Sequence, residues 1–403
     1  MSAQNILIEE SQSLKRASED AESLAFDYLR SFPAINARHS GATLFEHLKG
    51  VYDKLVAWQC EQPIAFAGLF HSVYGTTSFR RQTLPLSARP KIAEIIGSEA
   101  EELAFEFCSL DTRQFTTQLR AKVRRDGAKG REILSPKEDA LLHVFTANWL
   151  EQFPRMRARQ KSRNVSFFKE MRPLLCASAV SEIDQIFDRP AQPISICDGP
   201  LTSDESGAAQ RFMMLDDFVP SLLQLKLSAL MEMNIWRYGW KAADTQSQHF
   251  FWHSHFAGDN DDGGEVDCET ELHDRPLVAP VLELWQLIKQ SIGAGHVPVR
   301  VYANGHTFGD DGHVHTDATT PGHYTSLYYA HPQWDHNWGG ETLFFNSDRD
   351  TILHSSFPKP GRLVHFSGTI PHTARSPARD CPALRSVIVI KSFKAPDHTH
   401  ANP

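Results

Sequence analysis

The sequence predicts an α+β protein with two domains: an all-α N-terminal domain, then an antiparallel β-sandwich or jelly roll with supporting helices. Apolar residues recur at helical spacing through roughly the first 190 residues. Short runs of strand-forming residues, separated by turn signals, fill the C-terminal part. The length of 403 residues also exceeds what a single hydrophobic core usually serves.

The N-terminal domain is expected to be helical because its apolar residues follow the helical period. Residues 42–59 place apolar side chains at spacings of three and four, which is typical of an amphipathic helix. Residues 62–73 are more uniformly apolar, as in a buried helix, and the helical pattern recurs at 138–152 and 178–188. Pro136 suits the first turn of a helix, where its missing N–H removes no hydrogen bond.

The composition changes near residue 190. Proline, glycine, serine and aspartate become frequent there, which favours a linker. Helical pattern returns briefly at 219–234 and 280–292. We therefore expect a helical domain over 1–190, a linker over 191–205, a second domain over 206–396 and a tail over 397–403.

Five short segments between residues 297 and 393 carry the strand pattern. They read VPVRVYA, TSLYYAHP, GETLFFN, GRLVHFSG and RSVIVIKSF, rich in β-branched and aromatic residues and separated by glycine, proline or asparagine. Strands of this length at this spacing are typical of a sandwich or jelly roll.

Composition excludes several classes of protein. A formal net charge of −8 argues against a dedicated nucleic-acid binder. The six cysteines contain no CxxC pair, which argues against a zinc ribbon and fits a reducing cytoplasm. No segment approaches the roughly 18 apolar residues of a membrane span, and the acidic N-terminus does not resemble a signal peptide. We expect a cytoplasmic protein with neither nucleic-acid nor membrane partners.

Histidine is the unusual residue type. Of the 20 histidines, nine lie between His306 and His372. His315 and Asp317 are two positions apart, so on a strand both project to one face. Together with His372 they supply two imidazoles and one carboxylate, the facial triad of non-haem Fe(II) oxygenases. The pair His313 and His315 has the same spacing and stays open as a rival.

Context strengthens the first choice. Arg385 opens a strand-like run after His372, where a guanidinium suits the distal carboxylate of 2-oxoglutarate. In order, the segments VYANG, HVHTD, SLYYAHPQWDHNWGGETLFF, KPGRLVHFSG, IPHTARSP and RSVIVIKSF resemble the prolyl-hydroxylase branch of the Fe(II)/2-oxoglutarate dioxygenases. The resemblance covers residues 298–393. It implies a double-stranded β-helix (a cupin-like jelly roll).

The resemblance also implies roles for individual residues. His315, Asp317 and His372 would bind iron, and Arg385 would pair with the C5 carboxylate of 2-oxoglutarate. Tyr302 and Tyr329 would line the co-substrate pocket. The implied cofactors are Fe(II), 2-oxoglutarate as co-substrate and O2, with ascorbate as a candidate reductant.

The implied reaction is hydroxylation of an unactivated C–H group with release of succinate and CO2. Asp317 is retained, which favours hydroxylation over the halogenation of related enzymes. Gly322 and Lys391 stand where the oxygen-sensing prolyl hydroxylases have an arginine and a tryptophan that face their peptide. This departure favours a small-molecule or amino-acid-like substrate, including a carrier-bound one.

The N-terminal segment RHSGATLFEHLKGVYDKLVAWQCEQPIAFAGLFHS resembles the HD-type helical domain, particularly that of alarmone hydrolases. The resemblance implies His47 and His71 as metal ligands, with Asp111 as a candidate distal aspartate. Ser72 replaces the aspartate that completes the His-Asp dyad. Three interpretations stay open: a degenerate structural or regulatory domain, a residual metal- or nucleotide-binding module, and an active hydrolase or second oxygenase.

Two alternatives to a small-molecule hydroxylase also stay open. One is a protein or peptidyl hydroxylase that docks its substrate through the helical domain. The other is a non-catalytic sensor, in which the jelly roll binds 2-oxoglutarate or iron and the helical half relays that state to a partner.

Overall fold

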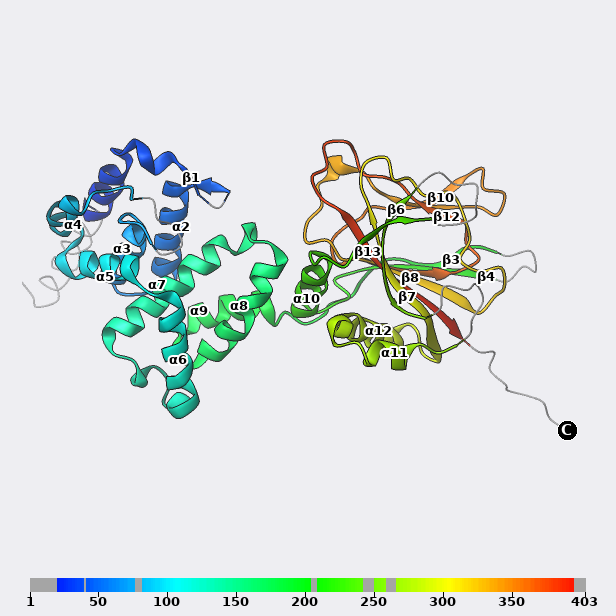
Figure 1. Ribbon diagram of the computed structural model, residues 1–403, viewed down its shortest axis with the longest axis horizontal. Helices are drawn as coiled ribbons and strands as arrows, with labels where there is room; N and C mark the ends of the chain where they lie inside the picture. The colour runs from blue at the N-terminus through cyan, green and yellow to red at the C-terminus, as the bar shows by residue number, and fades with distance from the viewer. Residues whose placement is uncertain are drawn as a thin grey trace, which may run out of the picture. The chain divides into compact units, whose positions relative to one another are not determined.

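The chain divides into two compact units (Figure 1). The computed structural model describes residues 20–39, 41–76, 82–203, 209–241, 250–258 and 266–394. The first unit comprises Met1–Met156 and Arg163–Gln185, and the second comprises Arg157–Ser162 and Ile186–Pro403. The expected tail at 397–403 lies outside the described residues. In the described part of the chain, the helices are all too short or too polar to cross a membrane.

The N-terminal half is helical, as its periodicity predicts. After a helical segment at residues 20–30, the elements are η1 (Pro33–Asn36), β1 (Arg38–His39), β2 (Ala42–Thr43), α2 (Leu44–Ala57), α3 (Gln62–Phe70), η2 (Leu86–Ala88), α4 (Arg89–Ile96), α5 (Ser98–Ser109), α6 (Thr112–Asp126), η3 (Gly127–Ile133), α7 (Pro136–Gln152), η4 (Phe153–Arg155), α8 (Ala158–Met171), η5 (Arg172–Leu174) and α9 (Ala177–Phe187).

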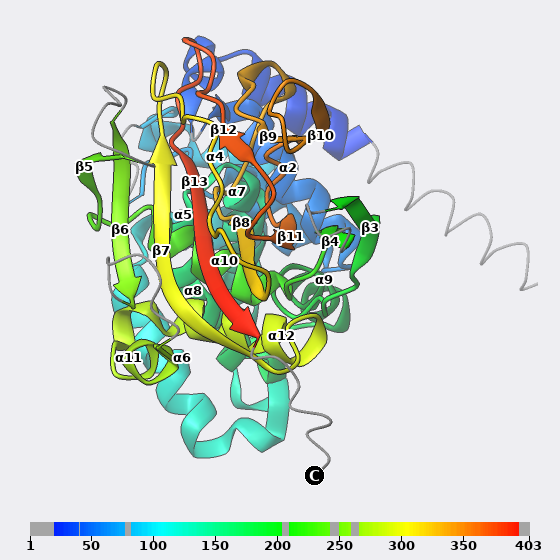
Figure 2. The ribbon, with the colours of Figure 1, turned by 90° about the vertical axis from the view of Figure 1, so that its right-hand side faces the viewer.

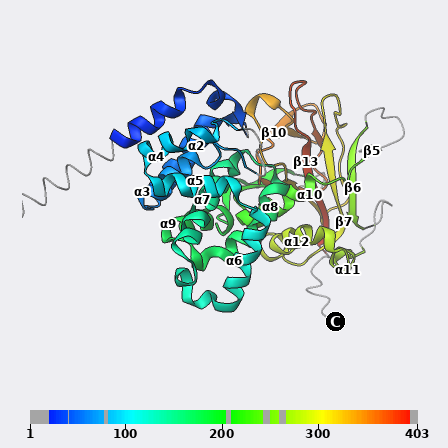
Figure 3. The ribbon, with the colours of Figure 1, turned by 60° about the vertical axis from the view of Figure 1, so that its left-hand side comes forward.

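Local sequence signals explain where helices α2 and α7 begin. Thr43 caps α2 through Glu46, and Ser135 caps α7 through Glu138, each in a reciprocal capping box. Helix α3 carries no polar face, because it packs against α2, α5 and α7 (Figure 3). The buried centre of the first unit is therefore built around α3.

The second unit contains most of the strands. They are β3 (Ile194–Ser203), β4 (Ala209–Asp216), β5 (Arg237–Trp240), β6 (Phe251–Ala257), β7 (His296–His306), β8 (His323–Tyr329), β9 (Thr342–Phe345), β10 (Ile352–Ser356), β11 (Leu363–Ser367), β12 (His372–Ala374) and β13 (Arg385–Lys394). The helices are α10 (Ser221–Met231), α11 (Glu269–His273) and α12 (Ala279–Ser291), with η6 (Pro276–Val278) and η7 (His336–Trp338).

These strands form two antiparallel sheets. The larger has the order β3-β4-β11-β8-β13-β7-β6-β5, and the smaller has the order β10-β9-β12. Figure 2 shows β13 between β7 and β8 at the centre of the larger sheet. A large antiparallel sheet facing a smaller one is the arrangement of a jelly roll.

Each face of the larger sheet has its own core. Val387 and Val389 of β13 pack in a cluster with Phe344 of the smaller sheet. Their neighbours Ile388 and Ile390 belong to a second cluster with residues of α10 and α12. This alternation follows from the strand period of two, so β13 separates the interior of the jelly roll from the helical layer.

One expected element differs from the structure. The segment 191–205 was predicted to be a linker, but β3 occupies most of it and pairs with β4. The pairing is interrupted by irregularities at Ser195/Cys197 and Pro200/Thr202. Proline lacks the N–H that an inner strand needs, but it is tolerated at a sheet edge, where β3 lies. The turn-forming residues of this segment therefore indicated a linker, although the segment forms an edge strand.

Candidate metal centre

His315, Asp317 and His372 meet inside the jelly roll because their backbones are tied together. His315 and His372 form an antiparallel bridge, in which each N–H donates to the other's carbonyl at 3.0 and 2.9 Å. The N–H of Asp317 donates to the carbonyl of Gly368 at 2.8 Å. His315 thus lies in an isolated bridge rather than in the strand expected from sequence. The separation of two residues still lets both side chains reach the same site.

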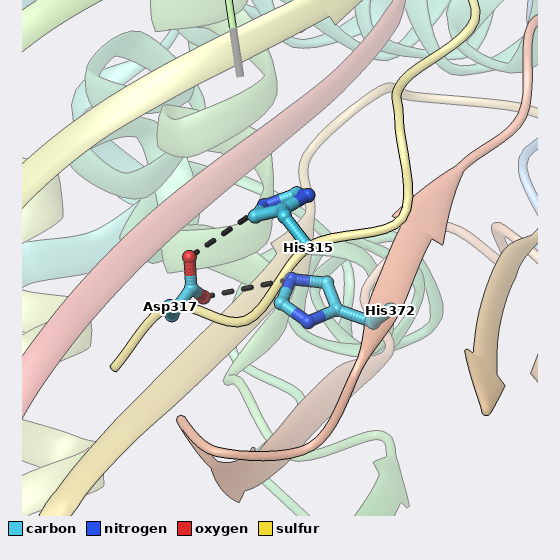
Figure 4. Close-up of side chains that lie close together, drawn as sticks. All are labelled: His315, Asp317 and His372. Atoms are coloured by element: carbon cyan, nitrogen blue, oxygen red, sulfur yellow. Dashed lines mark ion pairs between the residues drawn. The ribbon is translucent and has the colours of Figure 1, made fainter. Parts of the chain in front are cut away.

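The three side chains converge (Figure 4). Asp317 Oδ1 lies 3.7 Å from His315 Nε2, and Asp317 Oδ2 lies 3.5 Å from His372 Nε2. Within the described part of the chain this is the only group of three metal-ligating side chains whose donor atoms lie within 4.8 Å of one another. His313, the rival ligand, is exposed and lies outside this group.

Hydrogen bonds fix which nitrogen each imidazole offers. His315 Nδ1 lies 2.8 Å from the carbonyl of His313, and His372 Nδ1 lies 3.0 Å from the carbonyl of Ile370. A carbonyl only accepts, so each Nδ1 carries the proton and each Nε2 is left with a lone pair. Backbone carbonyls hold metal-binding histidines in this way.

The protonation states also suit a cation. Burial lowers the pKa of His372 to about 4, so its ring is neutral near pH 7. Burial alone would raise the pKa of Asp317, but the Lys391 ammonium and both imidazoles hold it well below its ordinary value. A neutral imidazole at His372 and an ionised carboxylate at Asp317 suit a divalent transition metal, and they fit Fe(II).

Two residues hold the carboxylate of Asp317. Thr325 Oγ1 donates to Oδ2 at 2.6 Å, and Lys391 Nζ lies 3.0 Å from Oδ1. Burial alone would lower the pKa of Lys391, but Asp317 raises it above its ordinary value, so the ammonium stays charged. Sequence reasoning noted Lys391 only as a departure from a family pattern. Its even spacing from Arg385 along β13 was the available signal that both face the interior.

Arg385 is a buried cation near this group. Its side chain is among the largest fully buried ones, at 2% exposure. Its Nε donates to the carbonyl of Gly340, one terminal nitrogen donates to Thr342 Oγ1 at 2.8 Å, and the guanidinium lies 5.3 Å from the ring centroid of Tyr329. Gly340 has φ +82°, and a Cβ there would lie 3.1 Å from Arg385 Cδ. Glycine therefore permits the turn that the guanidinium packs against.

The charge of Arg385 is not balanced by an ion pair. Among the described residues it forms no salt bridge within 4.0 Å, and the Glu341 carboxylate acts on it only through space. A buried charge without a partner is costly, so the arrangement favours an anion from outside the chain. Such an anion would be held by a planar fork of donors, which matches a carboxylate.

The two predicted tyrosines, Tyr302 and Tyr329, both belong to the core cluster inside the jelly roll. Tyr329 is fully buried, and its hydroxyl lies 2.8 Å from Thr342 Oγ1 beside Arg385. Tyr302 is buried on β7 near Lys391 and Asp317, and burial raises its pKa. The structure thus brings Tyr329 to the guanidinium and Tyr302 to the triad.

The second predicted site is only partly assembled. His47 and His71 are buried, with their Nε2 atoms 3.2 Å apart. Asp111 is exposed and caps α6, where its carboxylate accepts from the N–H of Gln114 at 2.9 Å. In the part of the chain that is described, no third ligand-bearing side chain completes this pair as a group. The HD-like interpretation therefore stays a prediction.

Glu151 is the residue that sequence reasoning missed there. His47 Nδ1 donates to Glu151 Oε2, and His71 Nδ1 lies 2.7 Å from the carbonyl of Gly68. Burial lowers the pKa of His71 to about 3. Glu151 is 104 positions away from His47. No local pattern connects two residues so far apart.

Comparison with known proteins gives limited similarity. A family model described as a domain of unknown function (DUF6817) matches residues 28–112. No curated protein matches the chain. Solved structures that are similar to it include a 2OG-Fe(II) oxygenase family oxidoreductase from Burkholderia pseudomallei, with 15% identity and a TM-score of 0.35, covering 45% of this chain and 84% of that one.

Two further similar structures are prolyl hydroxylases. The one from Trichoplax adhaerens, in complex with a hypoxia inducible factor peptide fragment, has 18% identity and a TM-score of 0.32 and covers 45% of this chain and 83% of that one. The prolyl-4-hydroxylase from Pseudomonas putida has 16% identity and a TM-score of 0.31, with 45% and 92% coverage.

Proposed function

We propose that the second unit is an Fe(II)- and 2-oxoglutarate-dependent dioxygenase. The observation that carries this proposal is the buried Arg385, which forms no salt bridge among the described residues and opens the strand whose interior face also bears Lys391. A metal-binding triad alone fits many cations. A triad combined with a buried, unbalanced guanidinium fits a metal that shares its site with an anionic co-substrate.

Each residue then has a defined part. His315 and His372 offer Nε2 and Asp317 offers its carboxylate to the metal, while Thr325 and Lys391 fix that carboxylate. Arg385 receives the distal carboxylate of 2-oxoglutarate, and the site's buried residues limit the access of water. Bound iron and 2-oxoglutarate would supply the activation of O2 that hydroxylates a C–H group and releases succinate and CO2.

The substrate class is a finer proposal: a small-molecule or amino-acid-like compound, free or carrier-bound. Lys391 and Arg300 are direct partners on β13 and β7, so both side chains project to the interior face. The Arg300 guanidinium lies 5.0 Å from the ring centroid of Tyr302. Arg300 adds a cation beside the triad, where Lys391 already pairs with Asp317, and this favours a substrate that carries an anionic group, such as the carboxylate of an amino acid.

The test is an anaerobic titration of the full-length protein with Fe(II) and 2-oxoglutarate. Chelation of 2-oxoglutarate by iron gives a visible charge-transfer band, and we expect a saturable band. Arg385→Gln should weaken 2-oxoglutarate binding by at least about 100-fold, since it removes a charge-assisted double contact. His372→Ala should abolish the band.

The control is Arg379→Gln, which removes an exposed arginine of the same unit. It should leave the titration unchanged. A folded protein that gives no band would refute the proposal. A band without succinate formation on exposure to O2, with or without amino-acid substrates, would instead favour a non-catalytic sensor.

A further inference from the structure

Two cysteines of the helical unit line one cavity. The cavity has a volume of about 470 Å³, and Cys60, Cys176, His143, Asp139 and Arg131 are among its lining residues. Cys60 follows α2 and Cys176 precedes α9, so the fold brings together two cysteines from distant parts of the chain. Both are free and half-buried, they line the same cavity, and each thiol shifts the pKa of the other.

The surroundings of Cys176 stabilise a thiolate. Cys176 immediately precedes α9, its carbonyl accepts from the N–H of Val180 at 3.0 Å, and the Ala179 backbone near its sulfur helps to lower the pKa of the thiol. A sulfur at the N-terminus of a helix is held among N–H groups and the positive end of the helix dipole. The contact with Cys60 and that with His143 act in the same direction, and together they lower the pKa of Cys176.

His143 is itself held in place. Its Nδ1 lies 2.8 Å from the carbonyl of Asp139, and its Nε2 accepts from the N–H of Cys176 at 3.1 Å. Asp139 is fixed by Arg131, whose two nitrogens lie 2.9 and 2.5 Å from the carboxylate oxygens. The backbone of Cys176 thus lies against a positioned imidazole, in a cavity that Arg131 also lines.

Cys60 has the opposite environment. The neighbouring Cys176 thiol, followed by burial, raises the pKa of Cys60, so its sulfur keeps the proton. A low-pKa thiolate next to a protonated thiol is the arrangement of an attacking cysteine and its resolving partner. The other buried cysteines differ: burial raises the pKa of Cys108 and of Cys268 to about 12.

A metal site fits these residues less well. Two sulfurs and an imidazole could bind zinc, but only if their donor atoms converged. In the described part of the chain, Cys60, Cys176 and His143 do not form a group with donors within 4.8 Å of one another.

We propose that Cys60 and Cys176 are a peroxide-reactive dithiol, with Cys176 as the attacking and Cys60 as the resolving residue. The Cys176 thiolate attacks one oxygen of hydrogen peroxide. An S–O bond forms, the O–O bond breaks, and the released hydroxide takes a proton to become water. The Cys60 sulfur then attacks the Cys176 sulfenic acid, an S–S bond forms, and the S–O bond breaks. The departing hydroxide and the Cys60 proton give a second water. The two thiols lose two electrons in total, and one peroxide becomes two waters.

The experiment uses the reduced full-length protein with a chelator present to suppress iron-driven oxidation. The protein is treated with one equivalent of hydrogen peroxide, alkylated with N-ethylmaleimide, and mapped by mass spectrometry without reduction. We expect a peptide pair cross-linked through Cys60 and Cys176, which dithiothreitol separates. Peroxide consumption should fall at least about tenfold in Cys176→Ser, since the thiolate is the reacting form.

Two variants test the order of events. In Cys60→Ser, the sulfenic acid at Cys176 should persist and be trapped by dimedone. In Cys381→Ser, a change of a half-buried cysteine in the other unit, the cross-link should form as in the original protein. Circular dichroism verifies that each variant is folded. The proposal is overturned if both thiols survive the peroxide, if the cross-link involves another cysteine, or if dimedone marks Cys60 instead.

Discussion

The two histidine clusters resemble each other in one respect and differ in another. In the triad, His315 and His372 each present Nε2 because a backbone carbonyl holds Nδ1. In the helical unit, His47 and His71 also present Nε2 toward each other, with Nδ1 held by Glu151 and by the carbonyl of Gly68. Both clusters have the supporting contacts that metal-binding histidines use.

The position of the carboxylate separates them. Asp317 faces both Nε2 atoms of the triad, at 3.7 and 3.5 Å. Glu151 contacts the opposite edge of His47, at Nδ1. At 3.2 Å, the two Nε2 atoms of the helical pair are close enough to share a hydrogen-bonded proton. Two histidines and an acid therefore make a metal site or a buried polar network, according to which edge of the ring the acid reaches.

The largest expected effect comes from removing the carboxylate that faces the nitrogens. Asp317→Ala should weaken Fe(II) binding by more than about 100-fold, because loss of a direct ligand exceeds the 10–100-fold cost of losing a supporting contact. Metal titration followed by dialysis measures this. Asp350→Asn, an exposed acid of the same unit, is the matched control. Unchanged affinity in Asp317→Ala would contradict the triad.

The equivalent change in the helical unit should affect stability rather than metal. Glu151 is 10% exposed and contacts His47 and Arg155, so Glu151→Gln leaves a buried network unpaired. We expect a loss of about 3 kcal/mol in the free energy of unfolding of the first unit, with iron content unchanged. Urea denaturation measures the free energy of unfolding, and metal analysis measures the iron content. If Glu151→Gln instead lost bound metal, the His47–His71 cluster would be a metal site like the triad.

The same variant has a pH signature. Burial alone would raise the pKa of Glu151, but His47 and Arg155 lower it below its ordinary value of 4.5. A carboxyl with a lowered folded-state pKa stabilises the protein above its ordinary pKa, and this stability is lost as pH falls through the folded-state value. Glu151→Gln should therefore flatten the decline in stability below about pH 4.5. If the free energy of unfolding falls with pH in parallel in the original protein and in Glu151→Gln, then Glu151 is not part of an ion pair in the folded protein.

A smaller effect on iron affinity is expected from replacing Lys391, whose ammonium contacts the triad residue Asp317. Lys391→Met removes the contact to Asp317 Oδ1 while keeping the length of the side chain. Iron affinity should fall about tenfold, within the range for supporting contacts. Lys391→Arg should restore part of it. A full loss in Lys391→Met would mean that the ammonium is needed to assemble the site, which thermal unfolding of the variant would reveal.

The smallest effect concerns Asp111. Its structural part is to cap α6, so Asp111→Ala should cost about 1 kcal/mol of stability and leave metal binding unchanged. Asp111→Ser keeps a capping oxygen and should recover most of that stability. Thermal denaturation distinguishes the two variants. Equal destabilisation by serine and alanine would imply a role beyond the cap.

Several elements could be predicted because their signals are local. Helical periodicity predicted α2 and α7, and a uniformly apolar segment predicted α3; in the structure, capping boxes fix where α2 and α7 begin. The β-branched run RSVIVIKSF predicted β13 as a strand, and the structure places Val387 and Val389 on one face and Ile388 on the other. β3 was missed for a related reason: its prolines and glycine indicate a turn, and only its pairing with β4 makes it a strand.

The sequence by itself determined the chemical types at the candidate site: two imidazoles, a carboxylate two positions from one of them, and an arginine that opens a strand. Tertiary structure decided which atoms face one another. Lys391 reaches Asp317 across 74 positions of chain, and Glu151 reaches the far edge of His47 from another helix. Such contacts depend on the register between strands and on the packing between helices. Residue periodicity indicates only the face on which a side chain lies, and it does not indicate which partner that side chain contacts.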